Sequence, residues 1–273
     1  MSRIQNTFKN LKQNNKKALG IFLTAGDPDF ETSINIIEQL PNNGVDFIEI
    51  GMPFSDPMAD GPAIQLSSQR ALKSGMNIEK CLNLVKRFRE KNNHTPIILM
   101  GYYNPIYKYG KENFVTKSID YGVDGIIIVD LPPEEDDELY NYSEKQGLSF
   151  IRLITPTTTK DRLVQILKKA TGFVYYVSIT GITGTQAPNV NDVSMNLKKI
   201  KSITDLPTVI GFGIRSPEQA YSMASISDGI VVGSAVVDLI KSSSEKSKNK
   251  EFTIKSCIEF VSKISNKLNI IKP

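Results

Sequence analysis

The chain of 273 residues is 40% apolar and 23% charged, so it can bury a sizeable core and long disordered segments are not expected. Its 33 basic and 29 acidic residues leave a net charge of +4, which is too small an excess to indicate a nucleic-acid-binding protein. The two cysteines, Cys81 and Cys257, are far apart in the sequence, which argues against a zinc site or a disulfide framework and fits a reducing compartment.

The single histidine limits the chemistry that the chain can use. His94 lies in a polar stretch typical of a loop, so Ser–His catalysis, Cys–His catalysis and histidine-based metal sites have little support. Acid–base chemistry is left to carboxylates, tyrosine and lysine. The N-terminus shows no hydrophobic signal segment, and no apolar run approaches about 18 residues. We therefore expect a cytoplasmic protein without a membrane anchor.

Short apolar runs recur along the whole chain and predict strands. Each run is continuous rather than alternating, which is typical of parallel strands that are buried on both faces. The predicted strands are residues 18–24, 47–51, 96–101, 125–130, 150–154, 173–178, 208–211 and 229–232.

Amphipathic segments between these runs predict helices. Apolar residues share one helical face in residues 30–40, 81–88 and 163–167, and again in a last helix over 254–268. Ser216, Pro217 and Gln219 have the spacing of a capped helix start. Residues 241–248 are polar and of low complexity, so we expect a solvated connector there.

The even alternation of strands and helices predicts a single (β/α)₈ TIM barrel domain over residues 1–273. Units of about 30 residues would use about 240, and the remainder fits an N-terminal helix, a longer loop after the second strand and a C-terminal helix. An open doubly wound sheet is the competing architecture. In a parallel barrel the active site forms where the strands end, so the carboxyl ends of the strands are where functional residues are expected.

The second strand carries Glu49 within an apolar run. Alternation points Glu49 into the barrel, opposite to Ile48 and Ile50, and burial should raise the pKa of its carboxyl group. This makes Glu49 a candidate acid near neutral pH. A structural glutamate paired with a lysine of a neighbouring strand is the alternative.

The loop after this strand, residues 52–62, holds three prolines and two aspartates. Proline stiffens a loop and fixes side-chain positions, and Asp60 could return over the mouth of the barrel as a second carboxylate. Two other interpretations stay open. Both aspartates could merely cap turns, or Glu49, Asp56 and Asp60 could hold Mg²⁺.

The last three predicted strands also end in candidate residues. Tyr175 lies in the sixth strand, where it could point inward or merely pack, and residues 179–188 after it resemble either a mobile lid or an ordinary loop. The seventh and eighth strands end in Gly211-Phe212-Gly213 and Gly233-Ser234. Glycine lets backbone N–H groups approach an anion closely, and barrels often bind phosphate with this pair of loops. We therefore expect a small phosphorylated substrate.

One long motif makes a family resemblance plain. Residues 49–65, which read EIGMPFSDPMADGPAIQ, resemble the signature of the tryptophan synthase alpha subunit family. The resemblance extends along the chain through residues 22–28, 100–105, 130–135, 181–184, 211–214 and 233–234. It implies a (β/α)₈ barrel that cleaves indole-3-glycerol phosphate to indole and D-glyceraldehyde 3-phosphate. It also implies an αββα complex, in which the beta subunit carries pyridoxal phosphate and receives the indole, with no cofactor in this chain.

The resemblance also implies roles for individual residues. Glu49 and Asp60 match the two catalytic carboxylates of the family, and Tyr175 matches its inward tyrosine. Residues that match the phosphate site are Gly184, Gly213, Gly233 and Ser234. Residues that match the wall of the indole pocket are Phe22, Met100, Ile127 and Phe212, and Thr183 would bond to Asp60 when the lid closes.

The chemistry gives the two carboxylates a hypothetical division of labour. Glu49, with a raised pKa, would deliver a proton to indole C3 and accept one from the glycerol hydroxyl, while an ionised Asp60 accepts a hydrogen bond from the indole N1–H. No metal is required. Three alternatives stay open: a free-standing indole-glycerol-phosphate lyase, another phosphate-binding barrel such as an isomerase or aldolase, and a non-catalytic barrel that activates a partner. A Schiff-base aldolase needs an inward lysine, which none of the predicted strands contains.

Overall fold

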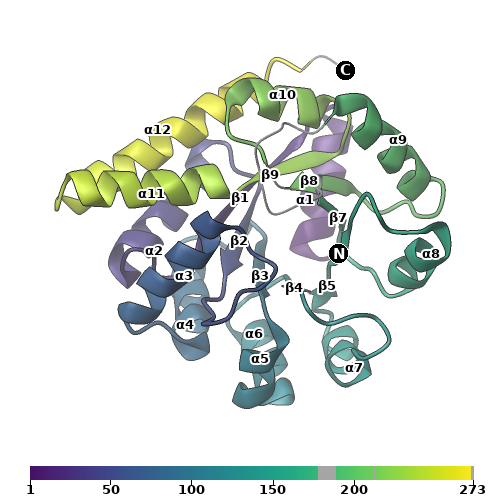
Figure 1. Ribbon diagram of the computed structural model, residues 1–273, viewed down its shortest axis with the longest axis horizontal. Coiled ribbons are helices and arrows are strands. Elements are labelled where there is room, and N and C mark those ends of the chain that lie inside the picture. The colour runs from purple at the N-terminus through teal and green to yellow at the C-terminus, as the bar shows by residue number, and fades with distance from the viewer. Residues whose placement is uncertain (178–188, 212, 272–273) are drawn as a thin grey trace.

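The computed structural model describes residues 1–177, 189–211 and 213–271. Within them, nine strands pair in parallel as one sheet (Figure 1). The strands are β1 (Ala18–Thr24), β2 (Phe47–Gly51), β3 (Ile97–Gly101), β4 (Gly125–Ile128), β5 (Ser149–Phe150), β6 (Arg152–Ile154), β7 (Val174–Val177), β8 (Thr208–Gly211) and β9 (Gly229–Val232). Their order across the sheet is β5-β4-β3-β2-β1-β9-β8-β7-β6.

The sheet closes on itself through the chain between β5 and β6. These two strands stand at the opposite ends of the order, yet only Ile151 separates them in the sequence. The Ile151 N–H donates to the Ile126 carbonyl oxygen at 2.9 Å, so Ile151 is still hydrogen-bonded to β4. The next residues form β6, which pairs with β7. Together β5 and β6 correspond to the fifth predicted strand. The predicted TIM barrel is therefore confirmed.

Helices surround the barrel as a ring (Figure 1). Those that the structure describes are α1 (Arg3–Gln13), α2 (Phe30–Gln39), α3 (Pro62–Lys73), α4 (Ile78–Arg89), α5 (Tyr103–Tyr109), α6 (Lys111–Asp120), α7 (Asp137–Lys145), α8 (Lys160–Lys168), α9 (Val190–Lys201), α10 (Pro217–Ser225), α11 (Ser234–Lys246) and α12 (Lys250–Leu268). The predicted cap of α10 is present, since the Ser216 hydroxyl accepts from the Gln219 N–H. The Gln219 side chain accepts from the Arg215 N–H, one residue before the expected donor. None of the helices in the described ranges is long and apolar enough to span a membrane.

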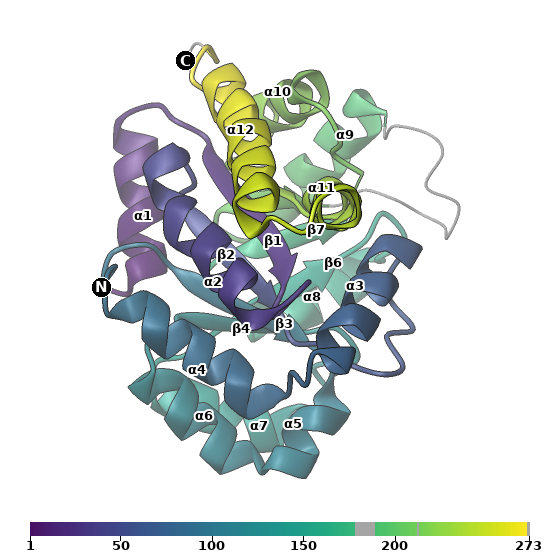
Figure 2. The same cartoon turned by 90° about the vertical axis from the view of Figure 1, so that its left-hand side faces the viewer.

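The core has two layers that follow the alternation of the strands. Residues such as Ile48 and Ile50 pack outward against the helices. The barrel interior is filled by a second group of buried side chains, called the inner cluster here, whose members are Ile4, Phe8, Ala18, Phe22, Phe47, Ile98, Met100, Ile127, Ile151, Phe173, Tyr175, Val209, Val231 and Val237. One end of this interior is closed by α1 (Figure 2), whose Phe8 ring lies 6.1 Å from the ring of Phe47 and 5.6 Å from that of Phe173. The opposite end, where the strands finish, is the end that α3 flanks (Figure 2).

Residues 241–248 are at least partly exposed except for Ser243, as expected for a solvated segment, but the expectation of a connector is wrong for most of them. Helix α11 continues to Lys246, and Ser243 is buried within it. The Ser243 hydroxyl donates to the Leu239 carbonyl oxygen at 2.6 Å, four residues earlier. Serine can satisfy its hydroxyl on the helix backbone in this way, so a serine-rich composition does not prevent a helix.

Candidate active site

Glu49 is a buried carboxyl group inside the barrel. Strand β2 pairs Glu49 with Phe22 of β1 on one side and with Ile98 of β3 on the other, and both neighbours belong to the inner cluster. Its side chain is fully buried, and neither carboxyl oxygen has a hydrogen-bond partner among the described residues. Burial raises the pKa of Glu49 to about 8, and the nearby Tyr175 phenol opposes part of that rise. At neutral pH this carboxyl group therefore holds its proton in most molecules.

Tyr175 lies inside the barrel, the inward position that the family resemblance implies, and it is a neighbour of Glu49. It belongs to the inner cluster, and burial together with the Glu49 charge raises the pKa of its phenol well above the ordinary value. The phenol is therefore neutral and turns its hydroxyl toward a protonated carboxyl group. The Tyr175 ring occupies this position because residue 211 is glycine. A Cβ atom at Gly211 would lie 2.1 Å from the Tyr175 hydroxyl oxygen.

Asp60 is held at the carboxyl end of the barrel by Tyr102, a residue that the sequence analysis did not single out. The Tyr102 hydroxyl donates to Asp60 Oδ2 at 3.0 Å and accepts from the Ala59 N–H, also at 3.0 Å. Its ring lies 5.2 Å from that of Phe54 in the same loop. Burial raises the pKa of Asp60 to about 6, and the Tyr102 hydrogen bond opposes the rise. Asp60 is thus mainly a carboxylate at pH 7, whereas Glu49 is mainly an acid.

The apolar wall around these carboxyl groups comes from neighbouring strands. Phe22, Met100 and Ile127 all belong to the inner cluster, and Met100 pairs in register with Ile127. Phe22 and Met100 each remain 8% exposed, so they border the mouth rather than the sealed interior. A Cβ atom at Gly51 would lie 2.6 Å from the Phe22 ring, which shows how closely the ring packs there. This wall suits a flat apolar ring.

The predicted phosphate site is described only in part. Gly213 has a φ of 80°, a conformation that favours glycine. Gly233 precedes α11, which begins at Ser234, and no side chain caps this helix start. A helix N-terminus without a side-chain cap can offer its N–H groups to an anion. Gly184, which was also predicted for this site, lies outside the described residues, as do Phe212 of the predicted indole pocket and Thr183 of the predicted lid.

The magnesium alternative lacks the geometry that it needs. Among residues 1–177, 189–211 and 213–271, no three His, Cys, Asp or Glu side chains are grouped so that they could hold a metal ion. Glu49, Asp56 and Asp60 therefore do not form such a group.

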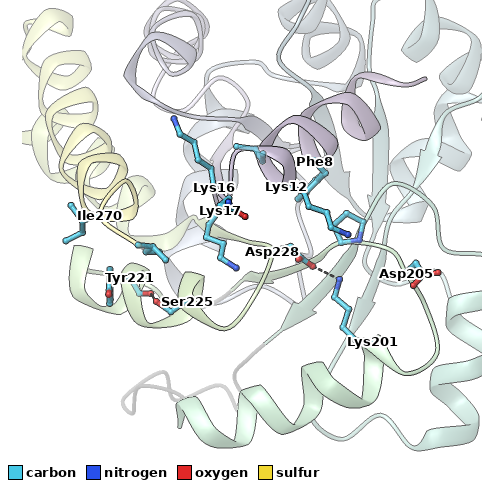
Figure 3. A pocket seen from close by; sticks show the side chains of 14 residues that line it. Phe8, Lys12, Lys16, Lys17, Lys201, Asp205, Tyr221, Ser225, Asp228 and Ile270 are labelled. Carbon is cyan, nitrogen blue, oxygen red and sulfur yellow. Dashed lines mark hydrogen bonds and ion pairs between the residues drawn. The ribbon is translucent and has the colours of Figure 1, made fainter. Parts of the chain in front are cut away.

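A hollow of about 690 Å³ is lined by residues that include Phe8, Lys17 and Asp228 but not Glu49 (Figure 3). It is lined by segments that precede β1, β8 and β9, so it opens at the amino ends of the strands. Lys17 donates to the Ser227 carbonyl oxygen at 2.7 Å, and Lys201 pairs with Asp228 at 2.6 Å. Two of its lysines are thus already engaged, and the hollow is not part of the candidate active site.

Comparisons with known proteins agree with this fold. The family model of the tryptophan synthase alpha chain matches residues 8–268. The solved structure of tryptophan synthase subunit alpha from Legionella pneumophila str. Paris is similar over 98% of this chain and 99% of its own, with 38% identity and a TM-score of 0.91. A structure from Aquifex aeolicus VF5 has 38% identity and a TM-score of 0.87 over 98% and 99% of the two chains. Tryptophan synthase from M. tuberculosis has 28% identity and a TM-score of 0.86, again over 98% and 99%. The chain belongs to the tryptophan synthase alpha chain family.

Proposed function

We propose that this chain is a cytoplasmic lyase subunit that cleaves indole-3-glycerol phosphate to indole and D-glyceraldehyde 3-phosphate. The observation that carries the proposal is the pair of carboxyl groups with different environments. Glu49 is fully buried inside the barrel with the neutral Tyr175 phenol beside it, whereas Asp60 lies at the mouth and accepts a hydrogen bond from Tyr102. Two carboxyl groups whose pKa values are separated in this way can divide the roles of acid and base.

The cleavage requires two balanced proton transfers. Protonated Glu49 gives its proton to indole C3, which leaves positive charge at N1, and the Asp60 carboxylate stabilises that charge by accepting a hydrogen bond from N1–H. Glu49 then takes the proton of the glycerol hydroxyl next to the ring. As the oxygen becomes a carbonyl, the bond between C3 and the glycerol carbon breaks and its electron pair returns to the indole. Glu49 ends as it began, in the protonated form.

The remaining residues position the substrate. Phe22, Met100 and Ile127 would pack against the indole ring, because they form the apolar wall around Glu49. We assign the phosphate group to Gly213, Gly233 and Ser234 at the ends of β8 and β9. Gly184 would complete the phosphate subsite and Phe212 the indole pocket, and Thr183 would bond to Asp60. The neutral phenol of Tyr175 would orient the Glu49 carboxyl group.

We further propose a beta subunit as the partner, in an α₂β₂ tetramer. The alpha-chain family membership favours this over the free-standing lyase. Exposed apolar side chains near the carboxyl ends of β2 and β3 offer a docking face, since Met58 is 77% and Tyr107 61% exposed. The proton transfers above use only side chains of this chain, and pyridoxal phosphate is expected in the beta subunit.

Release of glyceraldehyde 3-phosphate from indole-3-glycerol phosphate tests the proposal. The protein alone, the protein with a beta subunit and the Glu49→Gln variant should be compared. We expect turnover that rises steeply with the beta subunit and is lost in the variant. Fast turnover without the beta subunit would support a free-standing lyase, and no turnover of the folded protein in either case would refute the lyase assignment.

A further inference from the structure

Helix α3 starts two residues after Asp60 and completely buries only small side chains, while Ala63 and Ile64 of its first turn pack partly buried against the inner cluster. Its fully or nearly fully buried residues are Ser67, Ser68 and Ala71, all of them small. Burial of small side chains contributes little free energy, so beyond its first turn the orientation of this helix depends mainly on its polar contacts.

Three polar side chains of α3 and its C-terminal cap reach the end of β1 and the turn that follows it. The Ser67 hydroxyl lies 2.6 Å from that of Thr24, and the Ser74 hydroxyl donates to the Gly26 carbonyl oxygen at 3.2 Å. Arg70 binds Asp27 in the same turn. Positions 67, 70 and 74 are spaced by three and four residues, so they form one stripe along the helix and its C-terminal cap.

The pair of Arg70 and Asp27 is the strongest of these contacts. Arg70 donates from Nε to one carboxylate oxygen and from Nη2 to the other, each at 2.7 Å. Asp27 is fully buried, and the Arg70 side chain is 24% exposed. A bidentate guanidinium–carboxylate pair fixes both the distance and the angle of its two partners. Its desolvation offsets much of its attraction, so it supplies orientation more than stability.

The start of α3 transmits this orientation to Asp60. The Gln65 side chain donates to the Asp60 carbonyl oxygen at 2.8 Å, which ties the backbone of Asp60 to the first turns of the helix. Because an α-helix rises about 1.5 Å per residue, Arg70 lies about 12 Å along the helix axis from Pro62. A tilt of about 5° at Arg70 would therefore move Asp60 by about 1 Å. A displacement of this size can lower a catalytic rate by about a hundredfold.

We propose that Asp27 and Arg70 are positioning residues for Asp60. The pair fixes the tilt of α3 and thereby holds the Asp60 carboxylate at the mouth of the barrel, in line with the Tyr102 hydroxyl. This inference rests on the proposed function, in which Asp60 stabilises charge on the indole ring. Neither residue touches the reacting atoms.

A pair of Arg→Lys variants separates positioning from stability. Arg70→Lys keeps the charge but loses the bidentate geometry. Arg89→Lys is the matched control, since Arg89 binds the buried Asp124 at 2.6 Å on the amino side of the barrel. With indole-3-glycerol phosphate and a beta subunit, we expect Arg70→Lys to lower kcat about ten- to a hundredfold with KM changed less than about threefold. Arg89→Lys should lower unfolding stability but leave kcat within about twofold. Equal kcat values for the two variants would overturn the inference.

A double variant tests whether the effect passes through Asp60. If it does, Arg70→Lys should change kcat less than about twofold in an Asp60→Asn background, because the positioned group is already gone. An unchanged fold-loss in that background would overturn the inference. Should Arg70→Lys not fold, Asp27→Asn replaces it in both comparisons. The proposed function fails separately, if the wild type releases no product or Asp60→Asn retains the wild-type kcat.

Discussion

The buried Glu49 should make the protein less stable as the pH rises, and Glu49→Gln should remove that dependence. A glutamic acid side chain in the unfolded chain loses its proton near the ordinary pKa of 4.5, whereas Glu49 in the folded protein keeps its proton up to about 8. Between these two values the folded state binds more protons than the unfolded state. The free energy of unfolding must then fall as the pH rises through this window.

The size of this effect follows from the two pKa values. Each unit between them lowers the free energy of unfolding by about 1.4 kcal/mol. The loss is about 3 kcal/mol at pH 7 and about 5 kcal/mol above pH 8, and below about pH 4.5 it vanishes. A typical domain has only about 5–15 kcal/mol of stability, so the effect is large. Gln has nearly the same shape as Glu but does not titrate, so its advantage over Glu should grow with pH by these amounts.

Urea unfolding followed by far-ultraviolet circular dichroism at pH 5, 7 and 9 measures the difference. The control is Glu90→Gln, because Glu90 is an exposed residue just after α4. We expect the stability of Glu49→Gln relative to the wild type to increase by about 2–3 kcal/mol from pH 5 to pH 7, and that of the control to stay nearly constant. A Glu49→Gln difference that is the same at all three pH values would refute the reasoning, since Glu49 would then not keep its proton in the folded state.

Three further predictions concern activity. The pH dependence of kcat/KM should be bell-shaped, because Asp60 must be ionised and Glu49 must be protonated. The pKa values of about 6 for Asp60 and about 8 for Glu49 set the two limbs, so kcat/KM should fall about tenfold at pH 5 and at pH 9. A flat profile would contradict these roles. Tyr102→Phe removes the hydrogen bond to Asp60, so kcat should fall about tenfold and the acid limb should move to higher pH; an unmoved limb would argue against this contact. Gly211→Ala brings a Cβ atom against the Tyr175 ring, so kcat should fall. Thermal unfolding should show that the free energy of unfolding is lower by about 1–3 kcal/mol. A kcat equal to that of the wild type would mean that the position of the ring does not matter for activity.

The sequence predicted the barrel well because its strands are buried on both faces. A strand covered by helices outside and side chains inside must be apolar throughout, and β1, β2, β8 and β9 begin and end where the apolar runs do. The break at Ile151 could not be foreseen. At Ile151 the chain changes its hydrogen-bond partner from β4 to β7. Such a change cannot be predicted from the sequence, because the residue types of an apolar run do not depend on which strand it pairs with.

The candidate site was predictable in its carboxylates but not in the groups that hold them. Glu49 stands out because a charged residue interrupts an apolar strand. Tyr102 gives only a weak signal, its place just after β3, and nothing in the sequence separates it from the adjacent Tyr103. Asp27 and Arg70 are 43 residues apart in the sequence, so only the folded chain brings them together. Spacing cannot reveal such a pair.

In the part of the chain that the structure describes, the packing of α1 closes the amino end of the barrel interior. Phe8, Phe47 and Phe173 obstruct the amino end, with centroids of the last two rings 5.3 Å apart. Under the proposed function, the product that forms beside Glu49 must therefore leave through the end by which the substrate enters, the end bordered by Phe22 and Met100. The interior is thus closed at its amino end, and a partner protein that covers the carboxyl end would determine where the product is released.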